Sequence, residues 1–338
     1  MTNPVAPSAP ALVPVKIAGT GSYLPERVMT NHDLEATVDT SDDWITSRTG
    51  IKERRIAAQD EYTSHLATKA ARAALEQAEL NPNDVELIIV ATITPDTLTP
   101  ATACYVQQQL GSLTAVAFDI SAACSGFLYA LDYAKHTVGT GAFKNALIIG
   151  AEKLSAFVDW NDRNTCVLFG DGAGAAVILP SASGDGKILS SQLGTDGAQA
   201  ELLNIPCGGS ACPITPDNAY EKTAVLAMQG REVFKHAVNA MKRASIEAIE
   251  AAGLSSKDIK LLIPHQANLR IIDAIVERLE ISREDVFINL DKYGNTSAAA
   301  VAIALDEANR SGRINRGDRI LLVAFGAGLT WASAVIEW

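Results

Sequence analysis

The apolar positions of this chain change their spacing from segment to segment. Short runs rich in β-branched residues alternate with longer stretches in which apolar residues recur every three or four positions. The short runs predict strands at residues 15–19, 85–92, 115–119, 145–150, 174–179, 259–263 and 318–324. The longer stretches predict helices at residues 64–79, 100–110, 124–138, 225–252, 268–279 and 296–311. Strands that alternate with helices are typical of a layered α/β protein.

Part of this pattern occurs twice. Residues 70–92 resemble residues 243–266, with Asp258 standing 174 residues after Asp84. Each copy consists of a predicted helix, a loop and a buried strand. A repeat of half the chain length indicates that a unit was duplicated, and it does not indicate a solenoid of short repeats.

A second pair of segments supports the duplication. Residues 141–152 match residues 312–328 in pattern, and the two segments begin 171 residues apart. The sequence therefore predicts two similar halves, residues 15–180 and 181–338, after a loose tail of residues 1–14 that is rich in Pro and Ala. We expect the functional site where loops of the two halves meet.

Composition narrows the possible functions. Of the 338 residues, 48% are hydrophobic and 20% are charged, which allows a large core and excludes a disordered chain. The 28 basic and 39 acidic residues leave a net charge of −11. This balance argues against a nucleic-acid-binding protein, which needs clustered Lys and Arg. Any acidic partner must therefore bind at a local basic patch.

The sequence also predicts a cytoplasmic protein. Its first residues, MTNPVAPSAPALVP, lack the basic and apolar regions of a signal peptide. Glycines interrupt the longest uncharged apolar stretch, residues 320–336, which predicts two buried strands rather than a membrane span. The odd number of cysteines, 5, does not suggest a disulfide framework. We interpret Cys207 and Cys212 as loop thiols, with no histidine nearby to complete a metal site.

The strongest local signal for chemistry is DISAACSGFLYALDYA, residues 119–134. Cys124 stands between a predicted strand and an apolar helix, so the positive end of that helix would favour its thiolate. Small neighbouring residues leave room for a substrate beside the sulfur. Free cysteines are also common as small buried residues. The segment alone therefore leaves two alternatives, a nucleophile and a core residue.

Two polar residues of the second half are further candidates. His265, in LLIPHQAN, directly follows a predicted buried strand. The alternative is a histidine whose hydrogen bonds are satisfied at the strand end. Asn295, in DKYGNTSAAA, is either a site residue or the N-cap of the helix predicted at 296–311.

Two glycine-rich segments lead to different predictions. FGDGAGAAVIL, residues 169–179, continues as a strand, whereas a dinucleotide fingerprint requires a helix after its glycines. We therefore reject a dinucleotide site there. In AFGAGLTWAS, near the C-terminus, glycine lets the backbone approach a ligand, and the Gly326 N–H is a candidate donor to an oxyanion.

These residues together resemble a known family. SAACSGF around Cys124, PHQAN around His265 and YGNTSAA around Asn295 are similar to the Cys-His-Asn triad of the β-ketoacyl-acyl-carrier-protein synthase III family. VDTSDDWITSRTGIKERR, FGDGAGAAV and FGAGLTWAS resemble the family too, so the likeness spans residues 15–338. It implies an α/β protein with the thiolase fold, a duplicated αβαβα five-layered sandwich, and a homodimer.

The resemblance also implies a reaction. Cys124 would take the acyl group from acyl-CoA, while the N–H groups of Cys124 and Gly326 stabilise the oxyanion. Malonyl-acyl-carrier protein would then lose CO2, with His265 and Asn295 as neutral hydrogen-bond donors to the enolate. Attack of the carbanion on the acyl group would give 3-oxoacyl-carrier protein. CoA is then a substrate thioester, and no cofactor or metal is expected.

Substrate-binding residues follow from the same resemblance, position by position. The expected CoA-binding residues are Trp44 and Arg163 around the adenine, and Thr40, Arg48, Gly230 and Asn268 along the pantetheine and phosphate path. Arg270 and Lys235 would receive the acidic carrier protein, although acidic residues nearby make this region less basic than expected.

Two residues are expected to gate the acyl pocket, Thr99 and Phe325. The resemblance places Thr99 across the dimer interface, at the end of the partner's acyl pocket. Members with short primers carry a bulky Phe at this position, so Thr predicts a deeper pocket and a longer primer. The alternative is that Thr99 is only a residue at a helix start, before Pro100.

Two other functions are alternatives to this condensation. A thiolase-fold acyltransferase or condensing enzyme of secondary metabolism would also use Cys124. A non-catalytic binding subunit would need none of the three residues. The pair His265 and Asn295 favours condensation, because simple acyl transfer requires no enolate site.

Overall fold

The computed structural model describes residues 12–218 and 224–338. In its first half, five strands form a sheet in the spatial order β1-β7-β6-β4-β5. These strands are β1 (Val15–Tyr23), β4 (Leu87–Ala91), β5 (Val116–Ile120), β6 (Ala146–Glu152) and β7 (Gly172–Pro180). β4 runs parallel to β5 and β6, whereas β7 is antiparallel to β6 and β1.

A four-stranded sheet in the second half repeats this arrangement, in the order β11-β12-β13-β8. Its strands are β8 (Lys187–Thr195), β11 (Leu261–Pro264), β12 (Arg319–Gly326) and β13 (Thr330–Glu337). β11 is parallel to β12, and β13 is antiparallel to β12 and β8. A single bridge between Leu262 and Val286 stands where the first half has β5. The predicted duplication is confirmed.

Strand register gives the length of the repeat. Ile88 pairs with Leu147 in the first sheet, and Leu262 pairs with Leu321 in the second, so each residue recurs 174 positions later. Gly141 and Gly312 both have positive φ, 76° and 72°, and they are 171 positions apart. The strands recur after 174 positions and the glycines after 171, so the loop before β12 is three residues longer than the loop before β6.

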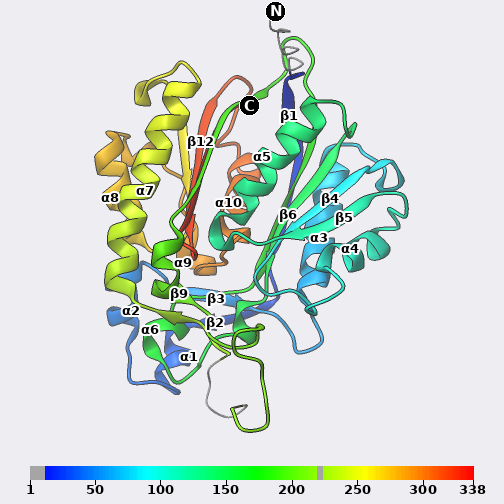
Figure 1. Cartoon of the computed structure of the whole chain (residues 1–338). Helices are drawn as coiled ribbons and strands as arrows, with labels where there is room; N and C mark the ends of the chain where they lie inside the picture. Colours follow the sequence, from blue (N-terminus) through cyan, green and yellow to red (C-terminus); the bar gives the residue numbers. More distant parts are fainter. Residues whose placement is uncertain (1–11, 219–223) are drawn as a thin grey trace, which may run out of the picture.

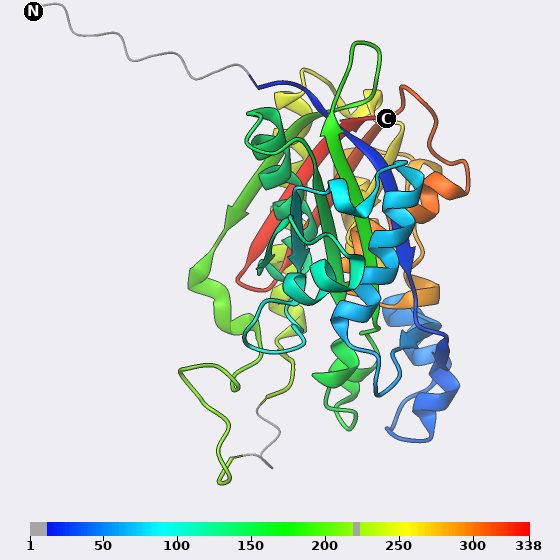
Figure 2. The same ribbon diagram turned by 90° about the vertical axis from the view of Figure 1, so that its right-hand side faces the viewer.

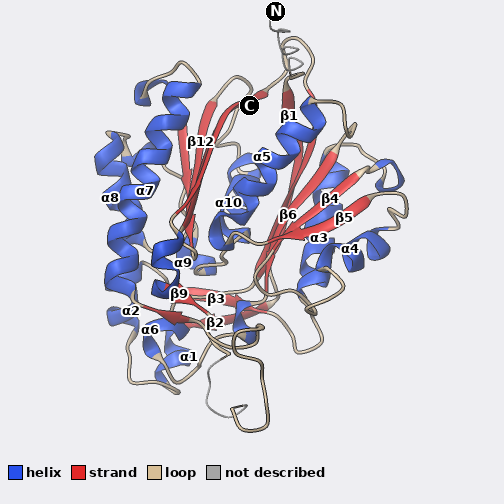
Figure 3. Ribbon diagram, viewed as in Figure 1, coloured by secondary structure: helices blue, strands red, loops and turns tan. Residues whose placement is uncertain are grey.

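Helices complete a stack of five layers (Figures 1 and 3). The outer helices of the first half are α3 (Thr63–Gln77) and α4 (Thr102–Leu110). Those of the second half are α7 (Gly230–Ala251) and α8 (Leu269–Leu279). The central helices α5 (Gly126–Gly139) and α10 (Ala299–Arg310) lie between the two sheets (Figure 1). This is the αβαβα sandwich that the family resemblance implies.

Burial on both faces of the sheets explains the apolar strand sequences. All residues of β6, ALIIGAE, are buried, and so is all of β12, RILLVAFG, except Arg319. Because helices cover both faces of each sheet, such strands have continuous apolar runs instead of alternation. α7 covers only one face, and it accordingly has one buried stripe that includes Val233, Ala237 and Met241.

Sequence analysis missed several short elements, most of which lie at the lower end of the molecule in Figure 1. They are α1 (Asn31–Glu35), α2 (Asp42–Thr49), α6 (Arg163–Cys166), α9 (Leu290–Tyr293), the pair β2 (Arg27–Thr30) and β3 (Glu53–Ile56), and the pair β9 (Leu203–Asn204) and β10 (Ala227–Met228). Such short segments show little periodicity. β8 was also missed, because its sequence KILSSQLGT is mostly polar. α7 begins at Gly230, later than the predicted residue 225, and α10 begins at Ala299 instead of residue 296.

The remaining expectations concern the ends and exposed segments of the chain. Residues 320–336 form the antiparallel pair β12–β13, as predicted, and none of the described helices is long and apolar enough to cross a membrane. Most of the predicted tail, residues 1–11, lies outside the described residues. Figure 2 shows the yellow-green segment after β9 projecting from the body of the protein.

Candidate active site

Cys124 lies in a tight turn between β5 and α5. A single 3-10 turn, Ala123–Ser125, leads directly into α5 at Gly126. Ala123 has a left-handed backbone, with φ 46°, which is unfavourable for a residue with a Cβ atom. The turn buries the cysteine, whose exposed fraction is 8%. The predicted position at a helix start is confirmed.

The expected effect of the helix on the thiol is outweighed by burial. Burial raises the pKa of the Cys124 thiol to about 12, and the hydroxyl of Ser297 lowers it only partly. Burial therefore opposes the predicted effect of the helix end, which stays a prediction. The sulfur is protonated at neutral pH, so its attack on a thioester requires a proton acceptor.

His265 directly follows β11, as predicted, and its backbone N–H donates to the Val323 carbonyl at 2.7 Å. The side chain is buried, which lowers its pKa to about 4. Its Nδ1 atom has no hydrogen-bond partner among the described residues. The alternative of a satisfied histidine is therefore wrong. The ring is neutral at physiological pH and can donate one N–H, which is what an enolate site requires.

Asn295 stands between α9 and α10, and backbone bonds to the first half hold it there. Its N–H donates to the Leu168 carbonyl at 2.8 Å, and its carbonyl accepts from the Gly170 N–H at 3.1 Å. Its side-chain Oδ1 accepts from the Ser297 N–H at 2.9 Å, which leaves the amide Nδ2 as a donor. The capping alternative is wrong, because α10 begins at Ala299 with Ala298 as its N-cap.

One cavity of about 770 Å³ joins the three residues, since Cys124, His265 and Asn295 all line it. They come from β5–α5, β11–α8 and α9–α10, so residues distant in sequence meet at one point. Gly326, at the end of β12, packs against the cysteine turn: a Cβ atom there would lie 2.6 Å from the Cys124 nitrogen. Only glycine fits that position, and the oxyanion role of the two N–H groups stays a prediction.

The cavity changes character from its mouth to the cysteine. The basic residues of its lining are exposed, and they are Arg48, Arg231 and Arg270. The apolar residues of its lining include the buried Leu154, Val167, Met241 and Phe325. The arrangement suits a molecule with an anionic end and a long uncharged arm that brings a reactive group to the buried sulfur.

The predicted CoA-binding residues gather around this mouth. Trp44, Arg48, Gly230 and Asn268 line the cavity, whereas Thr40 and Arg163 stand outside its lining. The Arg163 and Arg48 guanidinium carbons lie 5.2 and 4.9 Å from the Trp44 ring centroid. One pair of stacked groups already fills a gap of this size. An adenine ring can therefore enter between Trp44 and Arg163 only if the two side chains move apart. Their role stays a prediction.

Of the predicted carrier-protein and gate residues, one of each pair lines the cavity and the other does not. Arg270 lines the cavity mouth and donates to the Ser47 carbonyl at 3.1 Å, whereas Lys235 is exposed and pairs with Glu232 at 2.8 Å. Phe325 lines the cavity, but Thr99 is exposed in the loop before α4 and does not line the cavity of its own chain. The gate role of Thr99, which the resemblance places at the pocket of a partner subunit, stays a prediction.

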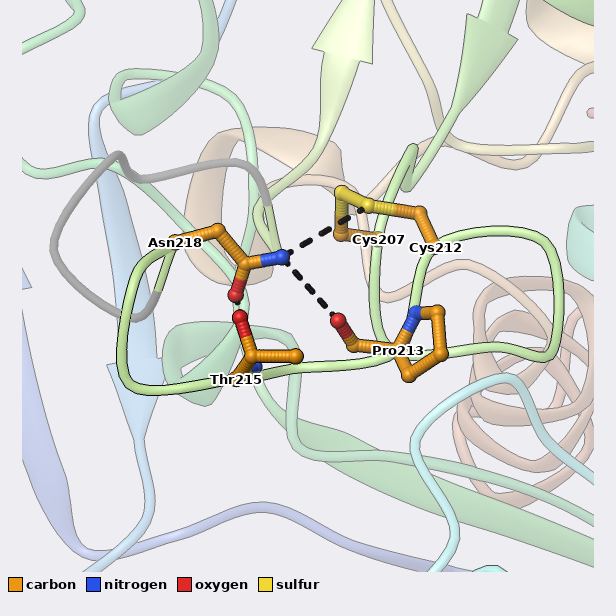
Figure 4. The surroundings of a disulfide bond; sticks show 5 residues. All are labelled: Cys207, Cys212, Pro213, Thr215 and Asn218. Atoms are coloured by element: carbon orange, nitrogen blue, oxygen red, sulfur yellow. Dashed lines mark hydrogen bonds between the residues drawn. A yellow bond between two sulfur atoms is a disulfide. The ribbon is translucent and has the colours of Figure 1, made fainter.

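The prediction of free thiols in the projecting segment is wrong. Cys207 and Cys212 form a disulfide, with Cα atoms 4.7 Å apart (Figure 4). Gly208, whose φ is 105°, folds the loop back so that its N–H donates to the Cys212 carbonyl at 2.8 Å. Local turn geometry thus brings together two cysteines that the sequence analysis treated as independent. The free cysteines among the described residues are Cys104, Cys124 and Cys166.

Two residues beside the triad were not predicted from the sequence. Ser297 lines the cavity, and Glu152 at the end of β6 is fully buried. Glu152 raises the pKa of the Cys124 thiol, so it acts on the reacting sulfur. An acid that directly follows the apolar run ALIIGA was the available signal. The described residues hold no group of three or more His, Cys, Asp or Glu that could bind a metal.

Family models match both halves of the chain. The model described as 3-oxoacyl-[acyl-carrier-protein (ACP)] synthase III matches residues 118–197. The model described as 3-oxoacyl-[acyl-carrier-protein (ACP)] synthase III C terminal matches residues 249–338. These two matched segments contain Cys124, His265 and Asn295.

Individual relatives are similar over nearly the whole chain. The beta-ketoacyl-[acyl-carrier-protein] synthase III of Caldanaerobacter subterraneus subsp. tengcongensis is 59% identical, with 95% of this chain and 97% of that protein covered. The crystal structure of 3-oxoacyl-[acyl-carrier-protein] synthase III from Aquifex aeolicus VF5 superposes with a TM-score of 0.89 at 51% identity, covering 96% of this chain and 100% of that one. The priming beta-ketosynthase of the R1128 polyketide biosynthetic pathway has a TM-score of 0.88 at 36% identity, with 98% of each chain covered.

Proposed function

Because the chain belongs to the 3-oxoacyl-[acyl-carrier-protein] synthase III family, we propose that it performs the decarboxylative condensation that initiates fatty-acid synthesis. In the first step, Cys124 attacks an acyl-CoA thioester, the new S–C bond forms, and CoA leaves as its thiolate. The N–H groups of Cys124 and Gly326 stabilise the oxyanion of this step. The chain is thus an acyltransferase with a covalent acyl-enzyme intermediate.

Malonyl-acyl-carrier protein enters for the second step. Loss of CO2 leaves an electron pair that is delocalised onto the thioester oxygen, where His265 and Asn295 donate hydrogen bonds. The carbanion then attacks the acyl carbon on Cys124, the S–C bond breaks, and 3-oxoacyl-carrier protein forms. Decarboxylation supplies the electron pair, so we expect the reaction to need neither a redox cofactor nor a metal.

One observation carries this proposal: two neutral donors and one thiol converge on a single buried cavity. Burial keeps His265 uncharged. The side chain of Asn295 uses its Oδ1 to accept from the Ser297 N–H, so its amide hydrogens remain available to donate. A neutral donor pair stabilises a developing enolate without binding the malonyl carboxylate so tightly that CO2 cannot leave. The test is incubation with radiolabelled acyl-CoA and malonyl-carrier protein, with 3-oxoacyl-carrier protein as the expected product.

A second candidate is initiation of a secondary-metabolite chain. The similarity to the priming ketosynthase of the R1128 polyketide pathway favours it. Both candidates use the same chemistry and differ in the carrier protein that they accept. Competition between the fatty-acid carrier protein and a polyketide carrier protein, each charged with malonate, separates the two by relative kcat/KM.

We further propose a homodimer that forms through β5. This edge strand leaves Val116 half exposed, and the neighbouring loops expose Leu98 by 89% and Leu113 by 75%. An unpaired edge strand with exposed apolar residues favours pairing with a second copy. Such a dimer would bring Thr99 to the partner's cavity. Sedimentation analysis of wild type and Leu113→Asp tests it, since the variant should be monomeric.

The substrates suggest where the protein works. Acyl-CoA and malonyl-carrier protein are intracellular thioesters, so we expect a cytoplasmic enzyme. Arg270 and Arg231 at the cavity mouth form the local basic patch that an acidic carrier protein needs against a net charge of −11. The cavity's apolar interior, together with Thr99 in place of a bulky residue, favours a primer of medium or long chain.

A further inference from the structure

Glu152 is a buried acid that the condensation described above does not use. It ends β6 and is fully buried, and its hydrogen bonds within the described residues come from neutral groups. Burial raises the pKa of its carboxyl to about 7. Keeping a carboxyl in a core without a cation costs free energy, so its position beside the reactive cysteine calls for an explanation.

Two threonines determine which oxygen of Glu152 can carry a proton. The Thr94 hydroxyl accepts from the Lys153 N–H at 2.9 Å, so its hydrogen points to Glu152 Oε2 at 2.6 Å. The Thr92 hydroxyl accepts from the Thr94 N–H at 3.0 Å and donates to the same Oε2 at 3.2 Å. Oε2 therefore receives hydrogens from both sides. A proton on Glu152 is directed to Oε1, which receives only a long contact of 3.3 Å from the Ile93 N–H.

Ser297 is a neighbour of both groups: it lines the cavity with Cys124, and Ala298 next to it packs against Gly150, two residues before Glu152. Ser297 is buried, and its hydroxyl has no partner at hydrogen-bonding geometry among the described residues. Yet this hydroxyl lowers the pKa of both the Cys124 thiol and the Glu152 carboxyl. The hydroxyl therefore affects both groups and forms a fixed hydrogen bond with neither.

The backbone holds Ser297 in this place at a cost. Its φ is 48°, a left-handed conformation that is unfavourable for a residue with a side chain. Its N–H is fixed by Asn295 Oδ1, and the following Ala298 carbonyl packs so closely on Gly150 of β6 that no Cβ atom would fit there. Strain of this kind persists where the surrounding packing imposes it, as at functional sites.

We propose that Ser297 and Glu152 form a proton path for Cys124, which takes the thiol proton when the sulfur attacks the primer and returns it after condensation. Ser297 lines the same cavity as the reacting sulfur, whereas Glu152 acts through Ser297 and is a positioning residue. The inference rests on the proposed function of Cys124 as the acyl carrier.

The protons balance over one turnover. When the S–C bond to the primer forms, the thiol proton moves to Ser297 Oγ and the Ser297 proton moves to Glu152 Oε1. The CoA thiolate that leaves takes a proton from water. When the carbanion displaces the acyl group, the Cys124 thiolate receives its proton from Ser297, which is replenished by Glu152. The sum is the consumption of one proton from water for each CO2 that is released.

Glu152 is better suited to accept the proton than the other titratable groups around the site. His265 has a pKa of about 4, so it is the weaker base, and it is required as a donor later in the cycle. Lys153 directs its ammonium away, to the Ala58 and Glu61 carbonyls at 2.7 Å each. Asp171, before β7, is bound by the Ser155 hydroxyl at 2.6 Å and by the Ala57 N–H at 2.8 Å.

The test is the rate at which iodoacetamide alkylates Cys124, measured by peptide mass spectrometry between pH 5 and 9. It requires no acyl-CoA or carrier protein, so its outcome is independent of the substrate assignment. The exposed Cys104 is an internal reference in every sample. We expect the wild-type rate to rise through about pH 7, and Glu152→Gln to be slower at pH 8 by about 10²-fold, the range of general-base catalysis.

Further variants separate a proton path from other roles. Ser297→Ala should match Glu152→Gln, the double variant should be no slower than either, and Glu152→Asp should regain part of the rate. Ser112→Ala, which removes another buried hydroxyl without a partner, is the control and should behave as wild type. A bystander carboxylate predicts the opposite sign, because removing its charge would lower the pKa of Cys124. Faster alkylation in Glu152→Gln, or multiplicative losses in the double variant, would overturn the proposal.

Discussion

Ala123 and Ser297 are counterparts in the two halves of the duplicated chain. They are 174 positions apart, the same distance as the paired strands, and both have left-handed backbones, with φ of 46° and 48°. Each precedes the start of a central helix, α5 or α10, that lies between the sheets. The residue that follows is Cys124 in one half and Ala298 in the other, so the duplication supplied two equivalent turns, and only one carries the nucleophile.

Cys124→Ala should abolish acyl loading, because no other described thiol lines the cavity. The measurement is the mass of the intact protein after incubation with acyl-CoA, which should increase by one acyl group in wild type only. Cys104→Ala is the matched control, since that cysteine is exposed and lies outside the cavity. Loading of Cys124→Ala at the wild-type rate would contradict the assignment.

His265→Ala and Asn295→Ala should load the primer and fail to decarboxylate malonyl-carrier protein. Each removes a neutral donor, by analogy with an oxyanion-hole donor whose loss costs about 2.7–4 kcal/mol, or 10²–10³ in rate. Release of labelled CO2 and acylation of Cys124 are measured separately in the same samples. Normal CO2 release in both variants would mean that the enolate is stabilised elsewhere.

Arg270→Glu should raise the KM for malonyl-carrier protein and leave acyl-CoA loading nearly unchanged. The reversed charge at the cavity mouth removes part of the basic patch, and this effect should weaken with added salt. Lys144→Glu, on an exposed loop outside the cavity, is the control for a change in net charge. An equal effect on both substrates would assign Arg270 to the CoA path instead.

Thr99→Phe should shift primer selectivity towards acetyl-CoA. If Thr99 ends the partner's acyl pocket, each buried methylene of a longer primer contributes about 0.8 kcal/mol that the ring would remove. The measurement compares loading of acetyl-CoA and octanoyl-CoA in both proteins. A wild type that accepts only acetyl-CoA, or a variant that keeps long-chain loading, would show that Thr99 is not the gate.

Glu152→Gln should become more stable relative to wild type as the pH rises. The pKa of Glu152 is about 7 in the folded chain, above its unfolded value of about 4.3. The unfolded state therefore loses its proton first, and wild-type stability decreases between these two pKa values and then stays level. Urea unfolding of both proteins at pH 5 and pH 8 measures this difference. An unchanged difference would mean that Glu152 is ionised throughout.

Local pattern was sufficient for the fold class and for much of the site. Continuous apolar runs predicted β6 and β12 because strands that are covered on both faces need no polar positions. The repeat predicted two similar halves, because both carry the same order of helix and strand. Cys124, His265 and Asn295 stood in segments distinctive enough to identify the family, and the structure places all three around one cavity.

The tertiary structure decided what depends on burial and on distant neighbours. The helix start at Cys124 is visible in the sequence, but the pKa of its thiol is raised because the folded chain buries it. Asn295 has the local features of a helix cap, yet backbone bonds to Leu168 and Gly170 hold it at the cavity instead. Glu152 and Ser297 are 145 residues apart and act on one sulfur only because β6 and the start of α10 pack together. Desolvation and contacts between distant residues arise only in the folded core. The spacing of residues along the chain therefore does not predict them.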